Sequence, residues 1–516
     1  MAFGKQSRAC ALVVGVSAAV VLSGCTGNRA DAPSTSEPAT TAAPTTSAAA
    51  AGLARYTSQE VSWREAGNGI ERATVKVPID YDNLAAGDTD LALVRVKSAP
   101  DSDRWLFSNP GGPGASGVLM TPQIALLAGM LTPELTKAYN FIGFDPRGVA
   151  ASDPLICGTT AQTDAAIADA APLTQESQTE WEEQSDALAE RCERTNQAQA
   201  SHVTTIETAR DMDVLRQLIG QDKLDYLGFS YGTYLGTTYA ALFPDKVGQM
   251  VLDGAVDPNQ SPMQASLGQT SGFETAFQAW AQDCVASSSG CPVGSSPEQI
   301  TSAVVDLLER VDAEPLPTKD PQRPLGSSGA FYGVADALYA QETWGDLTSA
   351  LASALRGDGT ALQALADDYF QRGPNGFHTN LFQANSVINS LDCQYQPKGA
   401  VDAAAFRAAS PTFGEISYRL AASSVDACAS YPLRTTLTAP DFSAPGAPPI
   451  LVIGTTRDPA TPLANAKALA STLSSGVLLT RDGDGHTAYL QDNQCINTAV
   501  TAFLVEGTVP ADGTAC

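Results

Sequence analysis

Apolar residues in this chain gather in short runs bounded by polar and turn-forming residues, as buried strands do. One run alternates strictly, Thr74-Val75-Lys76-Val77. Between the runs lie longer segments with the composition of helices, and this order of elements predicts an α/β fold with a mostly parallel central sheet. The predicted strands lie within residues 61–81, 91–97, 105–107, 141–144, 224–227, 250–252, 450–453 and 476–480.

One predicted strand, Leu224–Leu227, runs into the turn Gly228-Phe229-Ser230-Tyr231-Gly232. Residues Tyr234–Phe243 after the turn have the composition of a helix, which Pro244 ends. A G-x-S-x-G motif recurs by chance, but between a strand and a helix it is the nucleophile elbow of an α/β-hydrolase. Small neighbours tolerate the strained backbone of Ser230, and the helix directs the positive end of its dipole at the site.

The alternation stops between about Pro258 and Pro440, where helical segments predominate. An insertion of this length in an α/β-hydrolase predicts a helical cap over the active site. A chain of 516 residues is also too long for one small core. The predicted hydrolase core comprises residues 56–257 and 441–516, and the predicted cap comprises residues 258–440. The predicted helices are 176–197, 204–219, 273–286, 297–311, 329–355 and 359–371.

A serine nucleophile needs a base within hydrogen-bond reach and a carboxylate that orients the base. In this fold the chain order is serine, acid, histidine. The chain has three histidines. His202 precedes the elbow and His378 lies in the predicted cap, whereas His486 follows the last core strand. We therefore predict that His486 is the base.

The predicted acid is Asp458, which follows the strand 450–453 in the loop before the histidine loop. Asp253, at the end of the preceding strand, is the rival, although it could equally brace its own turn. Asp482 and Asp484 are too close to His486 in sequence to orient it from behind. Arg147, after the strand 141–144, could bind a substrate carboxylate, but a structural ion pair is the favoured interpretation.

A glycine-rich loop follows the strand 105–107 and contains Gly112-x-Gly114-x-x-Gly117, formally a dinucleotide-binding pattern. Pro113 removes one N–H donor that such a loop would present, and no acidic residue stands at a strand end about 20 positions later. As the early strand–helix loop of a hydrolase it would direct backbone N–H groups near Gly112 at the reacting carbonyl oxygen. We favour this oxyanion interpretation.

The first 24 residues have the pattern of an export signal, with Lys5 and Arg8 before an apolar run, Ala11–Leu22, that is too short to span a bilayer. Leu22-Ser23-Gly24-Cys25 resembles the lipobox of bacterial lipoproteins, in which cleavage precedes the cysteine and its thiol is lipidated. The alternative is an ordinary secretory signal cut nearby. Either predicts an exported protein, with the Ala/Thr/Ser/Pro-rich residues 25–55 as a linker.

The remaining cysteines fit an exported protein. Without Cys10 and Cys25 they number eight, an even number that predicts disulfides. Eight cysteines allow 105 pairings, so the sequence does not fix them, and pairing of neighbours along the chain is the simplest hypothesis. A zinc site is disfavoured because no C-x-x-C occurs, and no metal is predicted. The eight cysteines are Cys157, Cys192, Cys284, Cys291, Cys393, Cys428, Cys495 and Cys516.

The chain is strongly acidic, with a formal net charge of −26, which becomes −28 without residues 1–24 because these carry Lys5 and Arg8 and no acid. Such a charge repels nucleic acids and anionic membranes. We therefore expect no nucleic-acid partner, membrane contact only through the lipid anchor, and a monomer.

Several motifs together resemble the secreted tripeptidyl aminopeptidases of actinobacteria, which are related to proline iminopeptidases. The resemblance runs from about Tyr56 to Cys516. It implies a serine exopeptidase that needs no cofactor and removes short peptides, typically tripeptides, from free amino termini. It also implies the triad Ser230, Asp458 and His486. The oxyanion hole would be the N–H groups of Gly112 and Tyr231. The motifs are Asn109-Pro110-Gly111-Gly112-Pro113-Gly114, Asp145-Pro146-Arg147-Gly148, Glu207-Thr208-Ala209-Arg210-Asp211-Met212-Asp213, Gly228 to Gly236, Gly454 to Pro462, and Gly485-His486.

Recognition of the amino terminus in this family lies in the cap, where no residue of this chain can be matched to the family pattern. Glu274, Glu342 and Asp392 are candidate acids, although each also fits a solvated or structural role. The first alternative function is an esterase or lipase of the cell envelope with the same triad. A second alternative is a non-catalytic binding lipoprotein, which the complete triad disfavours. An endopeptidase would require a cleft open at both ends.

Overall fold

The computed structural model describes residues 46–288 and 290–516. The chain divides into two compact units, residues 1–55 and 56–516. Helix α1 (Thr46–Thr57) begins in the first unit. The predicted signal peptide, Cys25 and the linker up to residue 45 lie outside the described residues. Within the described part of the chain, no helix combines the length and the apolar character needed to cross a membrane.

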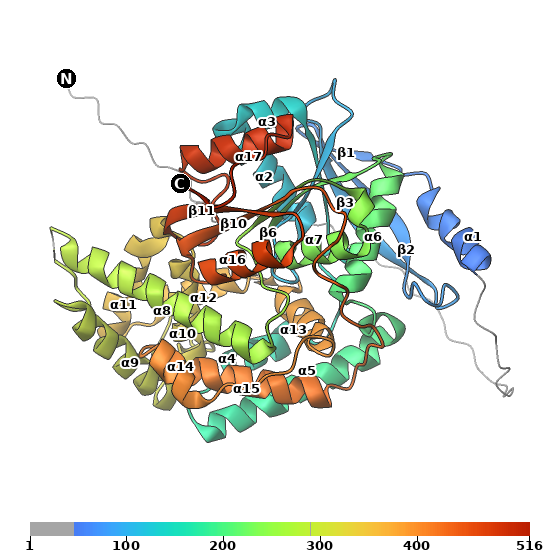
Figure 1. The fold of residues 1–516 in the computed structure, drawn as a ribbon. Coiled ribbons are helices and arrows are strands. Elements are labelled where there is room, and N and C mark those ends of the chain that lie inside the picture. Colours follow the sequence, from blue (N-terminus) through green and yellow to red (C-terminus); the bar gives the residue numbers. More distant parts are fainter. Residues whose placement is uncertain (1–45, 289) are drawn as a thin grey trace, which may run out of the picture. The chain divides into compact units, whose positions relative to one another are not determined.

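A ten-stranded sheet forms the centre of the second unit, in the order β1-β2-β3-β5-β4-β6-β7-β10-β11-β12 (Figure 1). The pairs from β1 to β3 and the pair β3–β5 are antiparallel, and all later pairs are parallel. The strands are β1 (Arg64–Gly67), β2 (Ile70–Pro78), β3 (Asp88–Val96), β4 (Trp105–Asn109), β5 (Asn140–Phe144), β6 (Leu224–Phe229), β7 (Val247–Asp253), β10 (Ile450–Arg457), β11 (Gly476–Asp484) and β12 (Thr514–Ala515).

Helices cover both faces of the sheet, which explains why its central strands are continuous apolar runs rather than alternating ones. Leu106, Phe141, Leu227 and Val251 lie in one buried cluster with side chains of α2, α3 and α17. Tyr226, whose side chain points to the opposite face, lies against α7. The helices around the sheet are α2 (Gly117–Leu131), α3 (Pro133–Ala138), α6 (Thr205–Leu218), α7 (Tyr231–Leu242), α16 (Leu463–Thr472), α17 (Gln494–Glu506) and the 3-10 turn η1 (Pro244–Lys246).

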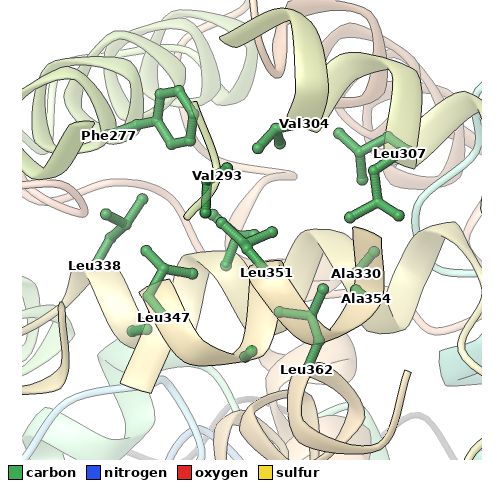
Figure 2. Packing of buried hydrophobic residues seen from close by; sticks show 14 of the residues in the cluster. Phe277, Val293, Val304, Leu307, Ala330, Leu338, Leu347, Leu351, Ala354 and Leu362 are labelled. Carbon is green, nitrogen blue, oxygen red and sulfur yellow. The ribbon is translucent and has the colours of Figure 1, made fainter. Parts of the chain in front are cut away.

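Between β7 and β10 the chain leaves the sheet and forms a helical insertion with a hydrophobic core of its own. Figure 2 shows Phe277, Val304, Leu307, Leu347 and Leu351 packed together in this core. The predicted α/β-hydrolase fold with a helical insertion is therefore confirmed. The insertion contains α8 (Pro262–Ala286), α9 (Pro297–Ala313), α10 (Ser327–Leu338), η2 (Gln341–Thr343), α11 (Trp344–Leu355), α12 (Thr360–Tyr369), α13 (Leu381–Asp392), α14 (Ala403–Ala409), α15 (Gly414–Ser430) and the hairpin of β8 (Arg372–Gly373) and β9 (Gly376–Phe377).

Two helices that precede the elbow also pack against the insertion: α4 (Thr160–Ala168) contacts α10, and α5 (Gln175–Ala200) contacts α15. The hydroxyl of Ser328 in α10 donates to the carbonyl of Ile167 in α4. The predicted cap limits, 258 and 440, stay a prediction.

The predicted helical segment 329–355 is interrupted at Ala340, whose backbone is extended (φ −143°, ψ 137°). The interruption separates α10 from η2 and α11. It leaves the carbonyl oxygen of Tyr339 free of the helix, and this oxygen accepts the N–H of His486. The break between α10 and η2 therefore coincides with a contact to a segment far away in the sequence.

The eight cysteines form four disulfides, each between neighbours along the chain, which confirms the simplest pairing hypothesis. One joins the loop after β5 to α5, one closes the turn after α8, one joins α13 to α15, and one ties the C-terminus to α17. The pairs are Cys157–Cys192, Cys284–Cys291, Cys393–Cys428 and Cys495–Cys516.

Candidate active site

Ser230 occupies the turn between β6 and α7 with φ 56° and ψ −125°. A non-glycine residue with positive φ is strained, and such strain concentrates at functional sites. Two backbone hydrogen bonds hold it in place. Its N–H donates to the Asp253 carbonyl oxygen at 2.9 Å, and its own carbonyl accepts the N–H of Thr233 at 2.8 Å.

The glycines on either side of Ser230 are required by close packing. A Cβ on Gly232 would lie 2.8 Å from the carbonyl oxygen of Asn109, at the end of β4. A Cβ on Gly228 would collide with the carbonyl oxygen of Gly232. The G-x-S-x-G pattern therefore follows from how tightly this turn crosses the neighbouring strand end.

The glycine-rich loop between β4 and α2 lies directly against Ser230. A Cβ on Gly111 would come within 2.9 Å of the Ser230 Cβ and 3.3 Å of the Tyr231 backbone nitrogen. The backbone of Gly112 also has a positive φ, of 112°. The two segments that carry the predicted oxyanion donors, at Gly112 and Tyr231, are thus brought together.

Asp145 anchors this loop, a role that the sequence analysis missed. Its carboxylate accepts hydrogen bonds from the Ser116 hydroxyl, the Val118 N–H at 3.0 Å and the Ala151 N–H at 3.0 Å. Asn385, from α13 of the insertion, donates from its side chain to the Pro113 carbonyl at 3.0 Å. Both the sheet edge and the insertion therefore fix the loop.

Asp458 and His486 meet as predicted. The His486 Nδ1 lies 2.8 Å and 3.0 Å from the two carboxylate oxygens of Asp458, which is completely buried at the end of β10. The Thr461 hydroxyl donates to the same carboxylate at 3.1 Å. A carboxylate opposite Nδ1 places the proton of the neutral imidazole on Nδ1. The lone pair is then on Nε2, which is buried and has no hydrogen-bond partner among the described residues.

Asp253, the rival acid, has another task. One of its carboxylate oxygens accepts the N–H groups of Ala488 at 3.0 Å and Tyr489 at 2.7 Å, just after His486. Burial raises the pKa of Asp253 to about 6. A Cβ on Gly254 would lie 3.1 Å from the His486 Cε1. Asp253 therefore braces the histidine loop, and Ser230 and His486 both adjoin the turn at Asp253 and Gly254.

The pKa of His486 is set by opposing effects. Burial of the ring lowers the pKa, because the imidazolium loses hydration. The charge and the hydrogen bond of Asp458 raise it, and the charge of Asp253 adds to them. The carboxylates outweigh burial, so the pKa lies above its ordinary value and the imidazolium is stabilised when it forms.

The insertion reaches His486 through Tyr339, which the sequence analysis did not single out. The Tyr339 carbonyl accepts the His486 N–H at 2.8 Å. The two rings are perpendicular with centroids 5.3 Å apart. Tyr369, at the end of α12, lies beside Tyr339 at 6.2 Å between centroids. Aromatic side chains of the insertion thus form a wall next to the imidazole.

Two carboxylates accompany these tyrosines. Asp336 lies one helical turn before Tyr339, and Asp368 directly precedes Tyr369. Burial raises the pKa of Asp336 to about 7, and repulsion from Asp368 adds to this effect. Neither side chain has a cation or a hydrogen-bond donor as partner among residues 46–288 and 290–516. Burial is the main cause of the raised pKa of the Tyr339 hydroxyl, but the charges of Asp458 and Asp336 both contribute.

The other sequence candidates lie elsewhere. His202 pairs with Glu207 at 2.8 Å, and the ring of His378 lies against Gly373 in the β8–β9 hairpin. Asp482 and Asp484 are engaged by Arg457, at 3.1 Å and 2.7 Å.

Arg147 has the structural role that the sequence favoured. Its guanidinium is buried and makes two hydrogen bonds to Asp211, at 2.8 Å and 2.6 Å. It also donates to the backbone carbonyls of Ile79, His202 and Pro78. Every N–H group of the guanidinium is therefore used, and none is left to bind a substrate carboxylate.

Two of the three candidate acids of the cap are already hydrogen-bonded within the fold, and the third is exposed at the surface. Glu274 accepts hydrogen bonds from the hydroxyls of Ser410 and Thr412. Asp392 binds the N–H and hydroxyl of Thr205 and the hydroxyl of Tyr395. Glu342 is exposed in the 3-10 turn η2. Two of them serve the fold and the third lies at the surface.

One group of metal-ligand type occurs in the described part of the chain: Asp80, His202 and Glu207, with ligand atoms within 4.8 Å of one another. The Arg147 guanidinium lies 4.0 Å from Glu207 and supplies positive charge there. His202 already bonds to the same carboxylate. An ion-pair network accounts for this group.

Comparison with known proteins agrees with the geometry. Residues 105–297 match the family model described as alpha/beta hydrolase fold, and residues 414–516 match that of TAP-like protein. The serine protease Hip1 of Mycobacterium tuberculosis is 37% identical over 463 residues, 85% of this chain and 86% of the relative. A protein of the same organism named carboxylesterase B is 38% identical over 457 residues, 86% of each chain.

The tripeptidyl aminopeptidase of Streptomyces lividans is 29% identical over 460 residues, 87% of this chain and 83% of the relative. The resemblance seen in the motifs therefore extends over the whole folded unit. This chain belongs to the α/β-hydrolase family that includes the tripeptidyl aminopeptidases and the Hip1 serine proteases of actinobacteria, and it is a serine hydrolase of the peptidase type.

Proposed function

We propose that this protein is an exported serine exopeptidase that releases short peptides, tripeptides in the first instance, from substrates with a free amino terminus. Ser230 is the nucleophile, His486 the base and Asp458 the acid that orients it. The observation that carries the proposal is the buried Asp458–His486 hydrogen bond, which leaves Nε2 without a hydrogen-bond partner among the described residues. The imidazole adjoins the turn at Asp253 and Gly254, and the Asp253 carbonyl oxygen accepts the N–H of the strained Ser230.

The first chemical step follows from the tautomer of the imidazole. Ser230 Oγ attacks the scissile carbonyl carbon while its proton passes to Nε2 of His486. Asp458 stabilises the resulting imidazolium, as the raised pKa of His486 implies. The oxyanion accepts hydrogen bonds from the N–H groups of Gly112 and Tyr231.

The intermediate then collapses. His486 returns the proton to the leaving amine, which departs with the rest of the substrate, and the amino-terminal peptide remains esterified to Ser230 as the acyl-enzyme. Water, deprotonated by Nε2, attacks this ester and restores the serine hydroxyl. Every proton is carried by His486, so the cycle needs no cofactor.

A free amino terminus is a cation at neutral pH and needs an anionic partner in the cap. Asp336 offers one. It is half-buried, has no cationic partner in the described part of the chain, and lies one helical turn before Tyr339, whose ring packs against that of His486. An ammonium group between Asp336 and Asp368 would relieve their repulsion. These two residues replace Glu274, Glu342 and Asp392 as the candidates for amino-terminus recognition.

Export fits the four disulfides, which form in oxidising compartments. We propose further that cleavage before Cys25 is followed by lipidation of its thiol, which would hold the enzyme at the outer face of the cell membrane. We also propose that it acts as a monomer on peptides.

The test compares wild type and Ser230→Ala on three chromogenic substrates: a tripeptide anilide with a free amino terminus, the same peptide N-acetylated, and a short-chain fatty-acid ester. We expect wild type to cleave the free peptide and not the acetylated one, and Ser230→Ala to lose this activity. Hydrolysis of the ester with neither peptide cut would refute the peptidase proposal.

The second candidate function is a carboxylesterase with the same triad. It is favoured by the name of one relative, carboxylesterase B, and by the aromatic wall of Tyr339 and Tyr369 beside His486. The unpartnered carboxylate of Asp336 opposes it, because an acyl chain gives that charge no counterion.

A further inference from the structure

Helix α2 (Gly117–Leu131) has an unusual composition for a surface helix. None of its 15 residues is charged, in a chain whose formal net charge is −26. A helix that is hydrophobic all round is normally buried on every side. Only one side of α2 is covered, because Val118, Thr121, Ile124, Ala125 and Ala128 face the sheet.

The other side of α2 carries large exposed apolar side chains. Leu119, Leu126 and Met130 are 45%, 62% and 68% exposed and lie on one face of the helix, since Leu126 follows Leu119 by two turns and Met130 follows it by three. Leu131 flanks them at 40%. We call these four residues the α2 face. Of the six large hydrophobic side chains that are exposed in the described part of the chain, four belong to it, the others being Ile156 and Val509.

Single exposed apolar residues need no explanation, but a cluster of them along one helix face, interrupted here by Gln123, marks a surface that is covered in use. We propose that the α2 face rests in the interface of the lipid bilayer to which Cys25 anchors the protein. A face of leucine and methionine without charge suits the boundary between headgroups and acyl chains. This inference rests on the proposed lipidation of Cys25, not on the proposed peptidase activity.

The length of the chain before the described residues supports this occupant. Cys25 and Thr46 are 21 positions apart. A chain of that length spans at most about 70 Å when it is fully extended. The folded unit, of comparable size, is therefore held within reach of the bilayer. Tethering gives a high effective concentration of lipid. The face that binds the bilayer most strongly through its apolar side chains then determines how the folded unit lies on the membrane.

Contact of the α2 face with the bilayer would fix the orientation of the active site relative to the membrane. α2 begins directly after the glycine-rich loop that lies against Ser230, with Ser116 as its N-cap. When α2 lies along the membrane surface, the carboxyl edge of the sheet, which carries Ser230, is held at a fixed height beside the bilayer. Peptides would then reach it from the aqueous side.

The test uses the full chain, produced in an actinobacterial host so that its own signal is processed, with Leu126→Cys labelled by the environment-sensitive dye NBD. The eight other cysteines of the mature chain are paired and Cys25 is blocked if lipidated, so the label has one thiol. The matched control is Ile156→Cys, whose native side chain is 60% exposed outside α2. Vesicles of phosphatidylcholine, with or without phosphatidylglycerol, are added to each protein, and detergent-phase partitioning reports the anchor.

We expect a blue shift and a several-fold rise in NBD emission at position 126 on vesicles, and no change at position 156. Adding Leu119→Gln and Met130→Gln should abolish most of the rise, while the circular dichroism spectrum, which reports folding, is unchanged. Equal responses at 126 and 156, or no response in either, would overturn the proposal. A shift without vesicles that grows with protein concentration would also overturn it, because it would identify a second copy of the chain as the occupant.

Discussion

The carboxyl edge of the sheet and the helical insertion contribute to the same site in different ways. At the sheet edge, Ser230, Asp458 and His486 come from loops whose backbones are fixed by neighbouring strand ends, such as the Ser230 N–H bonded to Asp253. In the insertion, Tyr339 and Asp336 come from helices held by a separate apolar core. Under the proposed function, chemistry is built on the rigid sheet, and substrate selection on the element that can vary without disturbing it.

The comparison can be tested at the sheet edge with two aspartates that both lie close to His486. Asp458→Asn should lower kcat about 10⁴-fold, because an amide favours the wrong imidazole tautomer. Asp253→Asn should lower it only roughly tenfold, because it loosens the histidine loop without touching Nδ1. Steady-state kinetics measure both, with circular dichroism as the control for folding. Equal losses would mean that Asp253 also acts on the imidazole directly.

In the insertion, Asp336→Asn should raise KM for free-amino peptides at least about 30-fold, because a buried charge pair with the substrate ammonium is lost. Its kcat should change little, since the triad residues are untouched. Glu342→Gln is the matched control, an exposed carboxylate in the adjacent turn, and should change neither constant. If Asp336→Asn left KM unaltered, amino-terminus recognition would have to be sought elsewhere.

The pH dependence of kcat tests the environment of His486 at the sheet edge. His486 acts as a base only when neutral, so kcat should fall as the pH drops through its pKa, which lies above 6.5. Asp253→Asn removes a negative charge and should move this acid limb to lower pH. Because the pKa of His486 is raised on folding, its contribution to stability is complete below pH 6.5 and is lost as the pH rises through the raised pKa. An acid limb of the kcat profile centred below pH 6.5 in wild type would contradict the raised pKa of His486.

The smallest effect concerns the strain at the elbow. Ser230→Gly should increase the free energy of unfolding by about 1 kcal/mol, because glycine adopts positive φ without strain. Ser201, at the end of α5 with φ −81°, provides the control. Ser201→Gly should give no increase, as measured by denaturant unfolding of both variants.

Much of the sheet edge could be read from the sequence because its constraints are local. Gly228 is required by a clash with Gly232 four residues later, although Gly232 is required by Asn109 at the end of a neighbouring strand. The position of His486 after the last core strand follows from the order of the fold. The choice between Asp458 and Asp253 could only be ranked, since both end adjacent parallel strands, β10 and β7.

The insertion was predicted as helical, but not its contents. Helix α10 ends at Leu338, and the next carbonyl, that of Tyr339, bonds to His486, almost 150 positions later. No local pattern predicts such a contact. The same holds for Asp336, which looks like any helical aspartate until burial beside Asp368 raises its pKa to about 7. Glu274 and Asp392 were singled out instead, and both proved to be structural.

By itself the sequence determined the hydrolase fold and the elbow at Ser230, whereas it left the pairing of the cysteines as a hypothesis that the structure then confirmed. Only the tertiary structure decided which aspartate orients His486 and which acids of the insertion lack partners among the described residues. It also showed that one apolar face of α2 is exposed to solvent. The physical reason is range. Turn propensity and the order of elements along the chain are properties of local sequence, whereas burial, pairing of charges and exposure depend on residues that the fold brings together from distant segments.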